Sequence, residues 1–464
     1  MKLLTTFYVA CLVLSACTII PLQTQAQRAC GNGILYQQMA KNDPEALKVL
    51  RQNHDRIIQQ TNFTANPNTT AKATAQNAIP IVFHFILDSA AYATLGNDSG
   101  ILRRVYSQLR VLNEDYNAGN ADKILIPDSF KRFYTNVNIQ FGLAKAQSTY
   151  TIQGGVEIKM IPKGVVPNYT VNNSYLAAKT TSNIGLDPWD VTKYLNIWIV
   201  NAGNTILGIT VPNSQVGTSY LGHIYSSNEL GVVLNMGAIG SRDFPTQYFM
   251  DSVYDKGRTL THELGHFFEL SHIWGDDNGA CPGDMSGGVQ IGFDDGIADT
   301  PPQADATYCT FKPYVCPSFP KLDKCSPQTP GIMFMNYMDY TDDRAMQMFT
   351  TMQGAVMHSQ IELGGESYSL TQNPQLLGVS NPGVLESDVQ ISPNPAINHL
   401  QVRVVNNQQL IRIEIVNLMG QMIGQQPSNG STNYDFELSF APRGIYLVKC
   451  QFAEGTLTRK IVLQ

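Results

Sequence analysis

One short run of the sequence carries three histidines and a glutamate at spacings that could hold a single metal ion. The run is His262-Glu263-Leu264-Gly265-His266-Phe267-Phe268-Glu269-Leu270-Ser271-His272. On a helix, residues four apart lie on one face, so the imidazoles of His262 and His266 can reach the same ion. With His272 as a third neutral imidazole, the fourth position of a tetrahedral zinc stays open, which is typical of a catalytic site.

Glu263 lies beside the two helical histidines, offset enough to hold a metal-bound water. Zinc lowers the pKa of such a water toward about 7, and Glu263 could take its proton and later deliver it to a leaving amine. A bare H-E-x-x-H also arises by chance on ordinary helices. Because only 8 of the 464 residues are His, a third one at this spacing favours a metal site.

The residues around this run predict a compact α/β domain over residues 78–370, with a twisted sheet, a backing helix and an active-site helix. The nearly continuous apolar run Ile79–Leu87 is typical of a buried strand, and Val137–Ala144 and Leu195–Val200 are two more. A helix should separate them, because apolar residues recur at helical spacing at Ile101, Val105, Leu109, Leu112 and Tyr116. Strands interleaved with a long helix indicate an α/β sheet.

The segment beyond Gly364 turns to Asn, Gln and Ser, and residues 385–464 predict a small all-β sandwich. Five short β-rich runs are separated by turns: Leu400–Val405, Ile411–Asn417, Tyr434–Phe440, Ile445–Phe452 and Thr456–Leu463.

The N-terminus predicts an exported protein. Residues 1–26 have a basic start, an apolar stretch and small residues near Ala26, as in a cleaved signal peptide. Leu14-Ser15-Ala16-Cys17 leaves a second interpretation open, in which a lipid is attached to Cys17. No later segment reaches the roughly 20 apolar residues that span a bilayer. Residues 27–77 resemble a prodomain: Asp43-Pro44 should begin a helix, and Thr61–Asn77 should be a linker open to proteolysis.

The charge of the chain argues against nucleic acid as a partner. The formal net charge is −6, and no run of Lys and Arg forms a basic stripe. Cysteine use agrees with export, because Cys281, Cys309, Cys316 and Cys325 cluster in one loop-rich stretch. In an oxidising compartment such a cluster indicates two disulfides, and a second zinc site is the alternative.

The histidine run resembles the long zinc-binding consensus of metzincin proteases, H-E-x-x-H-x-x-G-x-x-H. Asn336-Tyr337-Met338-Asp339-Tyr340 is similar to the Met-turn that lies beneath the metal in that class. The resemblance implies that Met338 is the turn methionine and that Tyr340 stabilises the tetrahedral intermediate. Taken alone, the two residues would be a core methionine and an interface tyrosine.

The wider context narrows the resemblance to the pappalysin family, in particular its bacterial cytophagalysin-like branch. Arg258-Thr259-Leu260-Thr261, Ile273-Trp274-Gly275-Asp276 and Asp299-Thr300-Pro301 carry it. One departure is Glu269, where the family usually has Gly and often Asn. This residue must leave the helix, and a positive φ there costs roughly 1–2 kcal/mol for other L-residues.

The pappalysin resemblance also implies a pairing of cysteines and a latent state. It suggests the disulfides Cys281–Cys325 and Cys309–Cys316. Arg28-Ala29-Cys30-Gly31 is similar to the cysteine switch of metzincin zymogens, in which a thiolate fills the fourth zinc position. A disulfide between Cys30 and Cys450 is the alternative.

Two further predictions concern acidic residues. Calcium takes 6–8 oxygen ligands, and an oxygen-rich stretch follows the third histidine, which predicts a structural calcium site rather than a solvated loop. Its candidate ligands are Asp276, Asp277, Asp284, Asp294, Asp295 and Asp299. Asp342 and Asp343, with Asp339, follow the Met-turn and could favour Arg or Lys after the scissile bond.

The C-terminal segment resembles the sorting domain of the type IX secretion system. Pro393-Asn394-Pro395, Leu418-Met419-Gly420, Gly444-Ile445-Tyr446 and Lys460-Ile461-Val462 carry the resemblance. It implies that the type IX machinery is a partner, and a generic adhesion-type sandwich is the alternative.

These patterns together predict a zinc-dependent endopeptidase, secreted or at the cell surface, made as a latent zymogen and acting on protein or peptide substrates. Two alternatives stay open. One is a peptidase-like protein that binds without cutting, against which the presence of Glu263 argues; the other is a displayed lipoprotein with a structural metal.

Overall fold

The computed structural model describes residues 30–64, 77–163, 174–203, 206–242, 253–311, 314–378, 389–404, 410–452 and 455–464. The predicted signal over residues 1–26, Cys17, Arg28 and residues 65–76 of the predicted linker lie outside the described residues.

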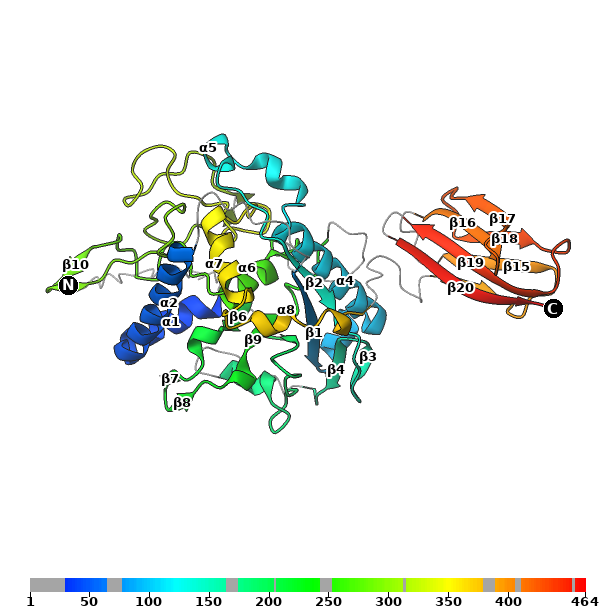
Figure 1. Ribbon diagram of the computed structural model, residues 1–464, viewed down its shortest axis with the longest axis horizontal. Coiled ribbons are helices and arrows are strands. Elements are labelled where there is room, and N and C mark those ends of the chain that lie inside the picture. Colours follow the sequence, from blue (N-terminus) through cyan, green and yellow to red (C-terminus); the bar gives the residue numbers. More distant parts are fainter. Residues whose placement is uncertain are drawn as a thin grey trace, which may run out of the picture.

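A twisted sheet forms the centre of the large domain (Figure 1). Its strand order is β3-β4-β1-β5-β9-β6, with β2 also paired to β1. The strands are β1 (Asn77–Leu87), β2 (Ile139–Leu143), β3 (Thr151–Gln153), β4 (Val156–Met160), β5 (Leu195–Val200), β6 (Gly208–Val211) and β9 (Gly231–Asn235). β2, β4 and β5 run parallel to β1, and β9 runs parallel to β5. The two strands at the ends of this order, β3 and β6, are antiparallel to β4 and β9. The predicted α/β sheet is thus confirmed.

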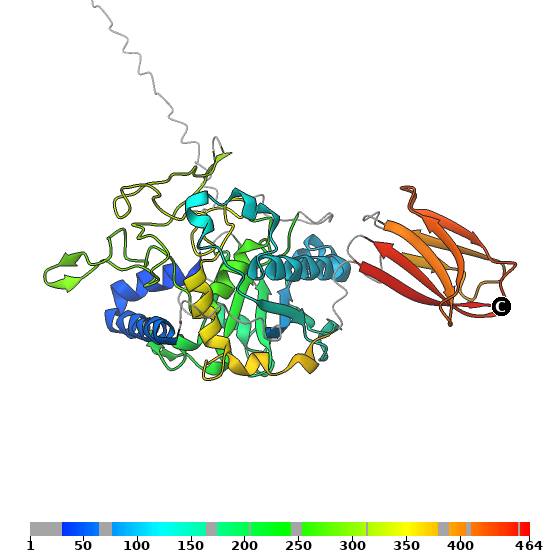
Figure 2. The ribbon, with the colours of Figure 1, turned by 45° about the horizontal axis from the view of Figure 1, so that its top comes forward.

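The helices α3 (Ser89–Thr94) and α4 (Asn97–Tyr116) follow β1, and α4 packs against the sheet (Figure 2). The apolar positions that predict this helix are buried and join the core with Phe83 and Phe85 of β1. α6 (Arg258–Phe267) lies on the same core, and α5 (Asp128–Lys131), α7 (Thr351–Ile361) and α8 (Tyr368–Thr371) complete the domain. Burial of these apolar faces supplies most of the driving force for this arrangement, at roughly 25 cal/mol per Å².

The segment before the sheet forms two helices, α1 (Gly31–Asn42) and α2 (Pro44–Thr64), that pack on the large domain. Asp43 caps α2, because its Oδ1 accepts the Ala46 N–H at 3.1 Å. The predicted linker begins too early, since α2 continues through Thr64. Thr61 Oγ1 lies 2.9 Å from Ile57 O and 3.1 Å from Ser359 Oγ of α7, so this last turn contacts the large domain.

Between α6 and α7 the chain is largely irregular, with short hairpins. They are formed by β10 (Met285–Ser286) with β11 (Val289–Gln290) and by β12 (Thr310–Phe311) with β13 (Tyr314–Val315). A third hairpin pairs β7 (Ser219–Tyr220) with β8 (His223–Ile224) ahead of α6. Short 3-10 helices occur at Ala121–Leu125, Ser174–Lys179, Asn213–Gln215, Ser227–Glu229 and Pro374–Leu376.

The C-terminal domain is a β-sandwich with its own apolar core. One sheet has the order β14-β15-β18 and the other β17-β16-β19-β20. The strands are β14 (Val389–Ser392), β15 (His399–Val404), β16 (Leu410–Asn417), β17 (Met422–Pro427), β18 (Asn433–Glu437), β19 (Gly444–Phe452) and β20 (Gly455–Leu463). The sequence prediction misses β14 and β17, because β14 is only four residues long and β17 is an exposed edge strand without buried positions.

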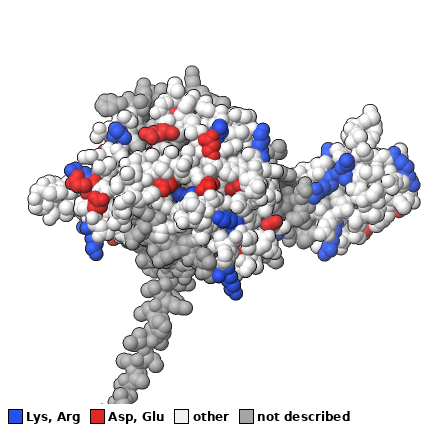
Figure 3. Space-filling view, turned by 90° about the horizontal axis from the view of Figure 1, so that it is seen from below, with Lys and Arg blue, Asp and Glu red and all other residues white. Residues whose placement is uncertain are grey.

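On the face seen in Figure 3, acidic and basic side chains are interspersed over the large domain, whereas the C-terminal domain presents mainly Lys and Arg. Among the described helices, none is long and apolar enough to cross a membrane.

Candidate metal centre and active site

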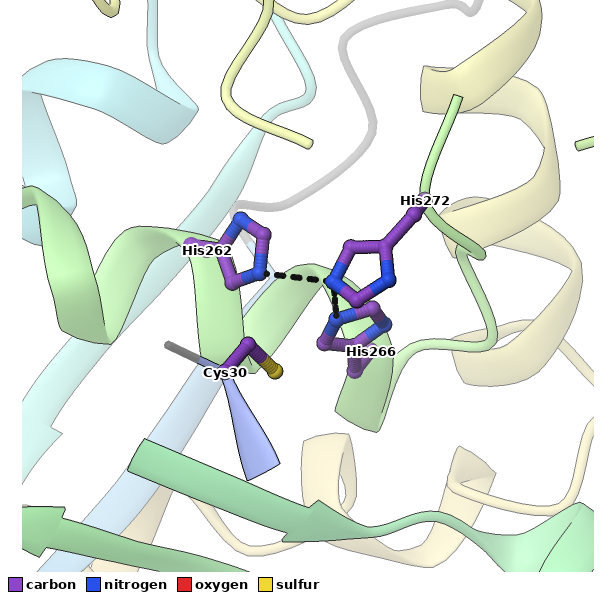
Figure 4. Close-up of side chains that lie close together, drawn as sticks. All are labelled: Cys30, His262, His266 and His272. Carbon is purple, nitrogen blue, oxygen red and sulfur yellow. Dashed lines mark hydrogen bonds between the residues drawn. The ribbon is translucent and has the colours of Figure 1, made fainter. Parts of the chain in front are cut away.

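Helix α6 is buried along its whole length and carries the first two histidines (Figure 4). His262 and His266 lie one turn apart, and their ring centroids are 4.8 Å apart. Gly265 lies between the two histidines. A side chain at this position would not fit, because its Cβ would overlap Met338 Sδ. The helix therefore approaches the Met-turn closely enough for the two imidazoles to point into one space.

The third histidine is brought back by a sharp turn at Glu269. This residue has φ +71°. The sequence predicts a positive φ at this position because the family usually has glycine there. The turn is closed by hydrogen bonds from Glu269 N to His266 O and from Leu270 N to Gly265 O, both 2.9 Å. Glu269 is buried, its Oε1 accepts the Ser214 N–H at 2.9 Å, and burial raises its pKa to about 7. A side-chain bond to the loop after β6 thus accompanies the strained backbone.

The three rings present unprotonated nitrogens to one another. His262 Nδ1 donates to Tyr337 O at 2.6 Å and His266 Nδ1 to Leu270 O at 2.7 Å, while His272 Nδ1 faces Asp276 Oδ2 at 2.6 Å. Since these oxygens accept, each Nδ1 carries the hydrogen and each Nε2 carries a lone pair. The Nε2 atoms are nevertheless only 3.0 Å (His266 to His272) and 3.2 Å (His272 to His262) apart.

Three lone pairs at such separations repel unless a cation lies between them. Zn–N bonds of about 2.0–2.1 Å in tetrahedral geometry would separate two nitrogens by roughly 3.3 Å, which the observed distances approach. Burial lowers the pKa of His266 well below its usual value, and the neighbouring His272 lowers it further. This ring therefore stays neutral. The donor set therefore fits a zinc-type cation.

Glu263 points from α6 toward the edge strand β6. Its Oε2 accepts the Thr210 hydroxyl at 2.7 Å, and Thr210 Oγ1 also lies 3.0 Å from Glu263 O. A Cβ at Gly208 would come within 2.6 Å of the Glu263 carboxylate, so glycine is needed there for the strand to pass. Gly208 and Thr210 lie far from the histidine run in sequence, and no spacing signal could have revealed them.

The Met-turn lies beneath the histidines, as the resemblance implies. Met338 is fully buried, and Asn336 Oδ1 accepts the Met338 N–H at 2.9 Å. Tyr337 supplies the carbonyl for His262, and its hydroxyl donates to Asp115 Oδ1 at 2.8 Å.

Asp115, at the end of α4, is a positioning residue that the sequence reasoning missed. Its carboxylate is held by Arg258 at 3.1 and 3.2 Å and accepts the Thr261 hydroxyl at 2.8 Å. Arg258 and Thr261 belong to α6, so one buried carboxylate connects the active-site helix to the turn below it. The sequence gives only a weak indication of this role for Asp115, because an acidic residue in an amphipathic helix is normally solvated.

Tyr340 lies beside the metal centre. Its ring centroid is 4.8 Å from that of His272 and 4.6 Å from that of Trp274. Its hydroxyl donates to the backbone oxygen of Cys30 at 3.3 Å, and burial raises its pKa well above the usual value. The protonated hydroxyl is thus available as a donor to a peptide carbonyl.

Cys30 completes the histidine group, because one ligand atom from each of Cys30, His262, His266 and His272 lies within 4.8 Å of the others. The side chain is buried and is not joined to Cys450, which is also free. Burial and the charge of Glu263 raise the pKa of the thiol, whereas a cation at the centre would act in the opposite direction.

The residues next to Cys30 are bound to the edge strand. Cys30 forms a parallel bridge with Gly208, and the Asn32 side chain bonds both Thr210 N, at 2.8 Å, and Thr210 O, at 2.9 Å. A Cβ at Gly33 would lie 2.7 Å from the Tyr340 hydroxyl. Glycine therefore lets the N-terminal segment enter the cleft, and Asn32 was not identified from sequence.

The aspartates predicted to bind calcium are not gathered. Two groups of three or more candidate ligands lie together in the described part of the chain: the histidines with Cys30, and Cys309 and Cys316 with Asp342. Each of the six aspartates instead accepts a hydrogen bond from a different donor: His272 Nδ1 to Asp276, Phe293 N to Asp277, Cys281 N to Asp284, Gly296 N to Asp294, Thr300 Oγ1 to Asp295 and Thr350 Oγ1 to Asp299. Asp276 is thus a partner of the third histidine.

Asp342 and Asp343, which the sequence predicts to line a substrate pocket, are both buried in this chain. They are 2% and 0% exposed. Asp343 Oδ2 accepts the N–H groups of Lys256 and Arg258, at 3.0 and 3.1 Å, and so caps the start of α6. Asp339 accepts the N–H groups of Thr307 and Tyr340. The carboxylates of Asp339 and Asp343 thus accept hydrogen bonds from backbone amides. A pocket lined by Asp342 and Asp343 stays a prediction.

The structure forms the disulfides Cys281–Cys325 and Cys309–Cys316, the pairing that the family resemblance implies. The sulfurs of the second candidate group are therefore not free thiolates.

A histidine-bearing helix beneath an edge strand, a sharp turn to a third imidazole and a methionine turn below them define a metzincin-type metalloprotease. Residues 178–362 match the family described as pregnancy-associated plasma protein-A, and residues 390–464 match a secretion system C-terminal sorting domain. The sorting domain assigns the chain to secreted or cell-surface proteins.

Solved structures from Tannerella forsythia are similar over most of their length. A promirolysin variant is 30% identical, with a TM-score of 0.59 over 75% of this chain and 99% of that one. Mature mirolysin in complex with a cleaved peptide is 32% identical, with a TM-score of 0.54 over 66% of this chain and 99% of that one. The chain therefore belongs to the pappalysin family of metalloproteases.

Fungal relatives named extracellular metalloprotease match shorter segments. The one from Verticillium alfalfae is 39% identical over 107 residues, 23% of this chain. That match, and one to a protein of Colletotrichum graminicola, spans 31% of the relative's length. A relative from Pyricularia oryzae is 25% identical over 65% of this chain and 81% of its own.

Proposed function

We propose that the chain is a zinc-dependent endopeptidase made as a latent proform. The observation that carries the proposal is the convergence of three Nε2 lone pairs whose Nδ1 atoms are all bonded to acceptors. Such a group is costly to bury without a cation. Zinc held there would supply Lewis acidity and make an attacking water more acidic.

The chain's own residues account for the proton transfers. Thr210 holds Glu263 Oε2, so Oε1 is the oxygen that takes the proton of the attacking water and later delivers it to the leaving amine. The Tyr340 hydroxyl donates to the carbonyl oxygen as negative charge develops on it. Its bond to the Cys30 carbonyl supports this role, because that carbonyl is also a peptide group in the cleft.

An extended substrate would bind along β6 by strand addition. The backbone N–H and C=O of Thr210 already bond a partner outside the sheet, the Asn32 side chain. Removal of the N-terminal segment would free both groups for a peptide backbone. Proteins and peptides are accordingly the proposed substrates.

Latency follows from the position of Cys30. A thiolate is a strong zinc ligand, and a cation at the centre would keep it deprotonated. It would then exclude the water that Glu263 must activate. Cleavage in residues 65–76 would release α1 and α2 and open the cleft. The C-terminal domain would address the chain to type IX machinery.

A peptide-library digest tests the enzymatic part of the proposal. The matured chain should cut peptides, lose activity with a zinc chelator and regain it with zinc. Hydrolysis that persists unchanged under exhaustive chelation would contradict the mechanism.

The latent state is tested in a full chain whose residues 65–76 resist cleavage. Cys30→Ala should raise peptidase activity markedly, and Cys450→Ala, which removes the other buried free cysteine, should not. A silent Cys30→Ala proform would show that something other than the thiol blocks the site.

A further inference from the structure

Trp274 lies flat on the third histidine of the metal centre. The centroids of the Trp274 and His272 rings are 4.3 Å apart, and the two ring planes differ by only 8°. The Gly275 N–H donates to His272 O at 3.0 Å, so the chain turns directly after His272 and returns the indole to the imidazole. Trp274 is only 3% exposed, and its stacking on His272 is therefore a buried contact.

Tyr340 completes a group of three mutually contacting rings. Its plane is nearly perpendicular to the other two, at 81° to His272 and 73° to Trp274, with centroid distances of 4.8 and 4.6 Å. Aromatic pairs favour such edge-to-face contacts, and their attraction depends on the angle between the rings. Tyr308 also neighbours Tyr340, but its centroid is farther away at 5.9 Å. The indole thus contacts both a metal-centre histidine and the tyrosine beside it.

His272 is held in two different ways. Asp276 Oδ2 accepts the His272 Nδ1–H at 2.6 Å, which sets the direction in which Nε2 points. The parallel indole of Trp274 instead covers the face of the imidazole. Loss of the indole should therefore leave the nitrogen ligands converged, and its main effect should fall on Tyr340.

In the latent chain the Tyr340 hydroxyl also has neighbours from the N-terminal segment. It donates to Cys30 O at 3.3 Å, and a Cβ at Gly33 would lie 2.7 Å from it. These contacts would leave with the N-terminal segment on maturation, whereas Trp274 belongs to the large domain. Trp274 would thus remain against the Tyr340 ring in the matured enzyme.

We propose that Trp274 is a positioning residue for peptide hydrolysis, which holds the Tyr340 hydroxyl at a fixed place relative to His272. The proposal rests on the peptidase function proposed above and adds to it the residue that places the hydroxyl donor. The place matters because a donor must lie about 2.7–3.1 Å from the oxygen that becomes negative in the transition state. A misplacement of about 1 Å can cost 10²-fold in rate.

The test is a double-mutant cycle in the matured enzyme at saturating zinc. Tyr340→Phe should lower kcat on the order of 10²-fold, the scale of one lost oxyanion donor. Trp274→Leu keeps apolar bulk but no flat ring, and it should lower kcat by about tenfold with KM unchanged, because the same donor is misplaced. The double variant should be no slower than Tyr340→Phe alone, since Trp274 acts through the hydroxyl.

Two further variants separate positioning from a general loss of packing. Trp274→Phe keeps a flat ring and should restore most of kcat. Trp198→Phe is the matched control, because Trp198 is also buried and stacks on a histidine outside the metal centre, His84, at 5.2 Å. It should leave kcat unchanged. Metal analysis should find zinc at wild-type stoichiometry in Trp274→Leu.

Indole fluorescence gives a readout that does not depend on hydrolysis. Co²⁺ added to the zinc-free full chain should quench the fluorescence of the wild type and of Trp198→Phe, because Trp274 lies against a metal-centre ring. The quenching should be much weaker in Trp274→Phe. Undiminished quenching in that variant would contradict the stacked contact itself.

The outcomes of the cycle distinguish the two proposals. If the losses from Tyr340→Phe and Trp274→Leu add in the double variant, or if Trp274→Leu has lost its zinc, the positioning role alone is overturned. If the wild-type chain hydrolyses no peptide, the proposed function fails and the positioning role fails with it.

Discussion

The metal centre and the acidic loop that follows it both concentrate candidate ligands in sequence, yet only the metal centre brings them together. Residues 262–272 hold three histidines whose Nε2 atoms converge. Residues 276–299 hold six candidate aspartates, each of which accepts a hydrogen bond from a different donor. A cluster of metal-ligating residue types in the sequence therefore does not by itself indicate a metal site. The backbone must also direct the side chains to one point.

The physical difference lies in the local structure. A helix repeats every 3.6 residues, so the spacing from His262 to His266 determines where both rings lie. The acidic loop has glycine turns at Gly275, Gly279, Gly283 and Gly296, all with positive φ. Each turn changes the chain direction, so the six carboxylates bond to separate N–H and hydroxyl donors. Calcium in this loop stays a prediction.

The largest effect is expected at Glu263, which makes the convergent histidines catalytic rather than merely metal-binding. Glu263→Ala should lower the hydrolysis rate by 10²–10⁴-fold or more, because the acid–base group is lost, while bound zinc stays at wild-type stoichiometry. Glu114→Ala, an exposed acid of α4, is the control and should leave the rate unchanged. Near-wild-type turnover in Glu263→Ala would remove the proposed mechanism.

A pH-dependent effect on stability is expected at Glu269, the residue that closes the turn to His272. Burial raises its folded pKa to about 7 from an ordinary value near 4.5. Between those values the folded chain keeps a proton that the unfolded chain has lost, so the free energy of unfolding falls as pH rises through this window. The loss is roughly 3 kcal/mol at most.

Glu269→Gln removes this titration and keeps an oxygen for the Ser214 N–H. Thermal unfolding of the large domain should therefore depend less on pH in the variant than in the wild type between pH ~5 and pH ~8. The same pH dependence in both chains would show that Glu269 is not the group responsible.

A smaller effect separates Asp276 from the rest of the acidic loop. Asp276→Ala removes the acceptor of His272 Nδ1 and should weaken zinc affinity by about 10–100-fold, measured by competition with a chelator. Asp284→Ala, which removes a carboxylate bonded to the Cys281 N–H, should leave zinc affinity unchanged. Equal losses in the two variants would mean that the loop acts on the metal as a unit.

The sequence was sufficient for those parts of the site that a local repeat or a motif determines. The helical spacing predicts α6 and its two histidines. The position of Glu269, where the family usually has glycine, predicts the positive φ. Alternating or continuous apolar runs predict β1, β2 and β5, because burial on the sheet faces requires them.

The rest depends on contacts between distant segments. Asp115 reaches α6 from α4, and Thr210 reaches Glu263 from β6, over separations that no pattern records. Gly275 packs on Phe293 across an irregular loop, and Arg51 of α2 donates to Gly275 O from a different part of the chain. The β17 strand has no apolar alternation, since it is exposed at a sheet edge.

The most direct test of the account is the zinc-edge X-ray absorption spectrum of the full chain loaded with one zinc. We expect three nitrogen ligands at about 2.0–2.1 Å and one sulfur ligand at about 2.3 Å. The sulfur should disappear in Cys30→Ala and in the matured chain, and remain in Cys450→Ala. A full-chain spectrum without sulfur, or a chain that binds no zinc, would contradict the central claim. That claim is that three histidines hold the zinc and that the Cys30 thiolate fills its fourth position.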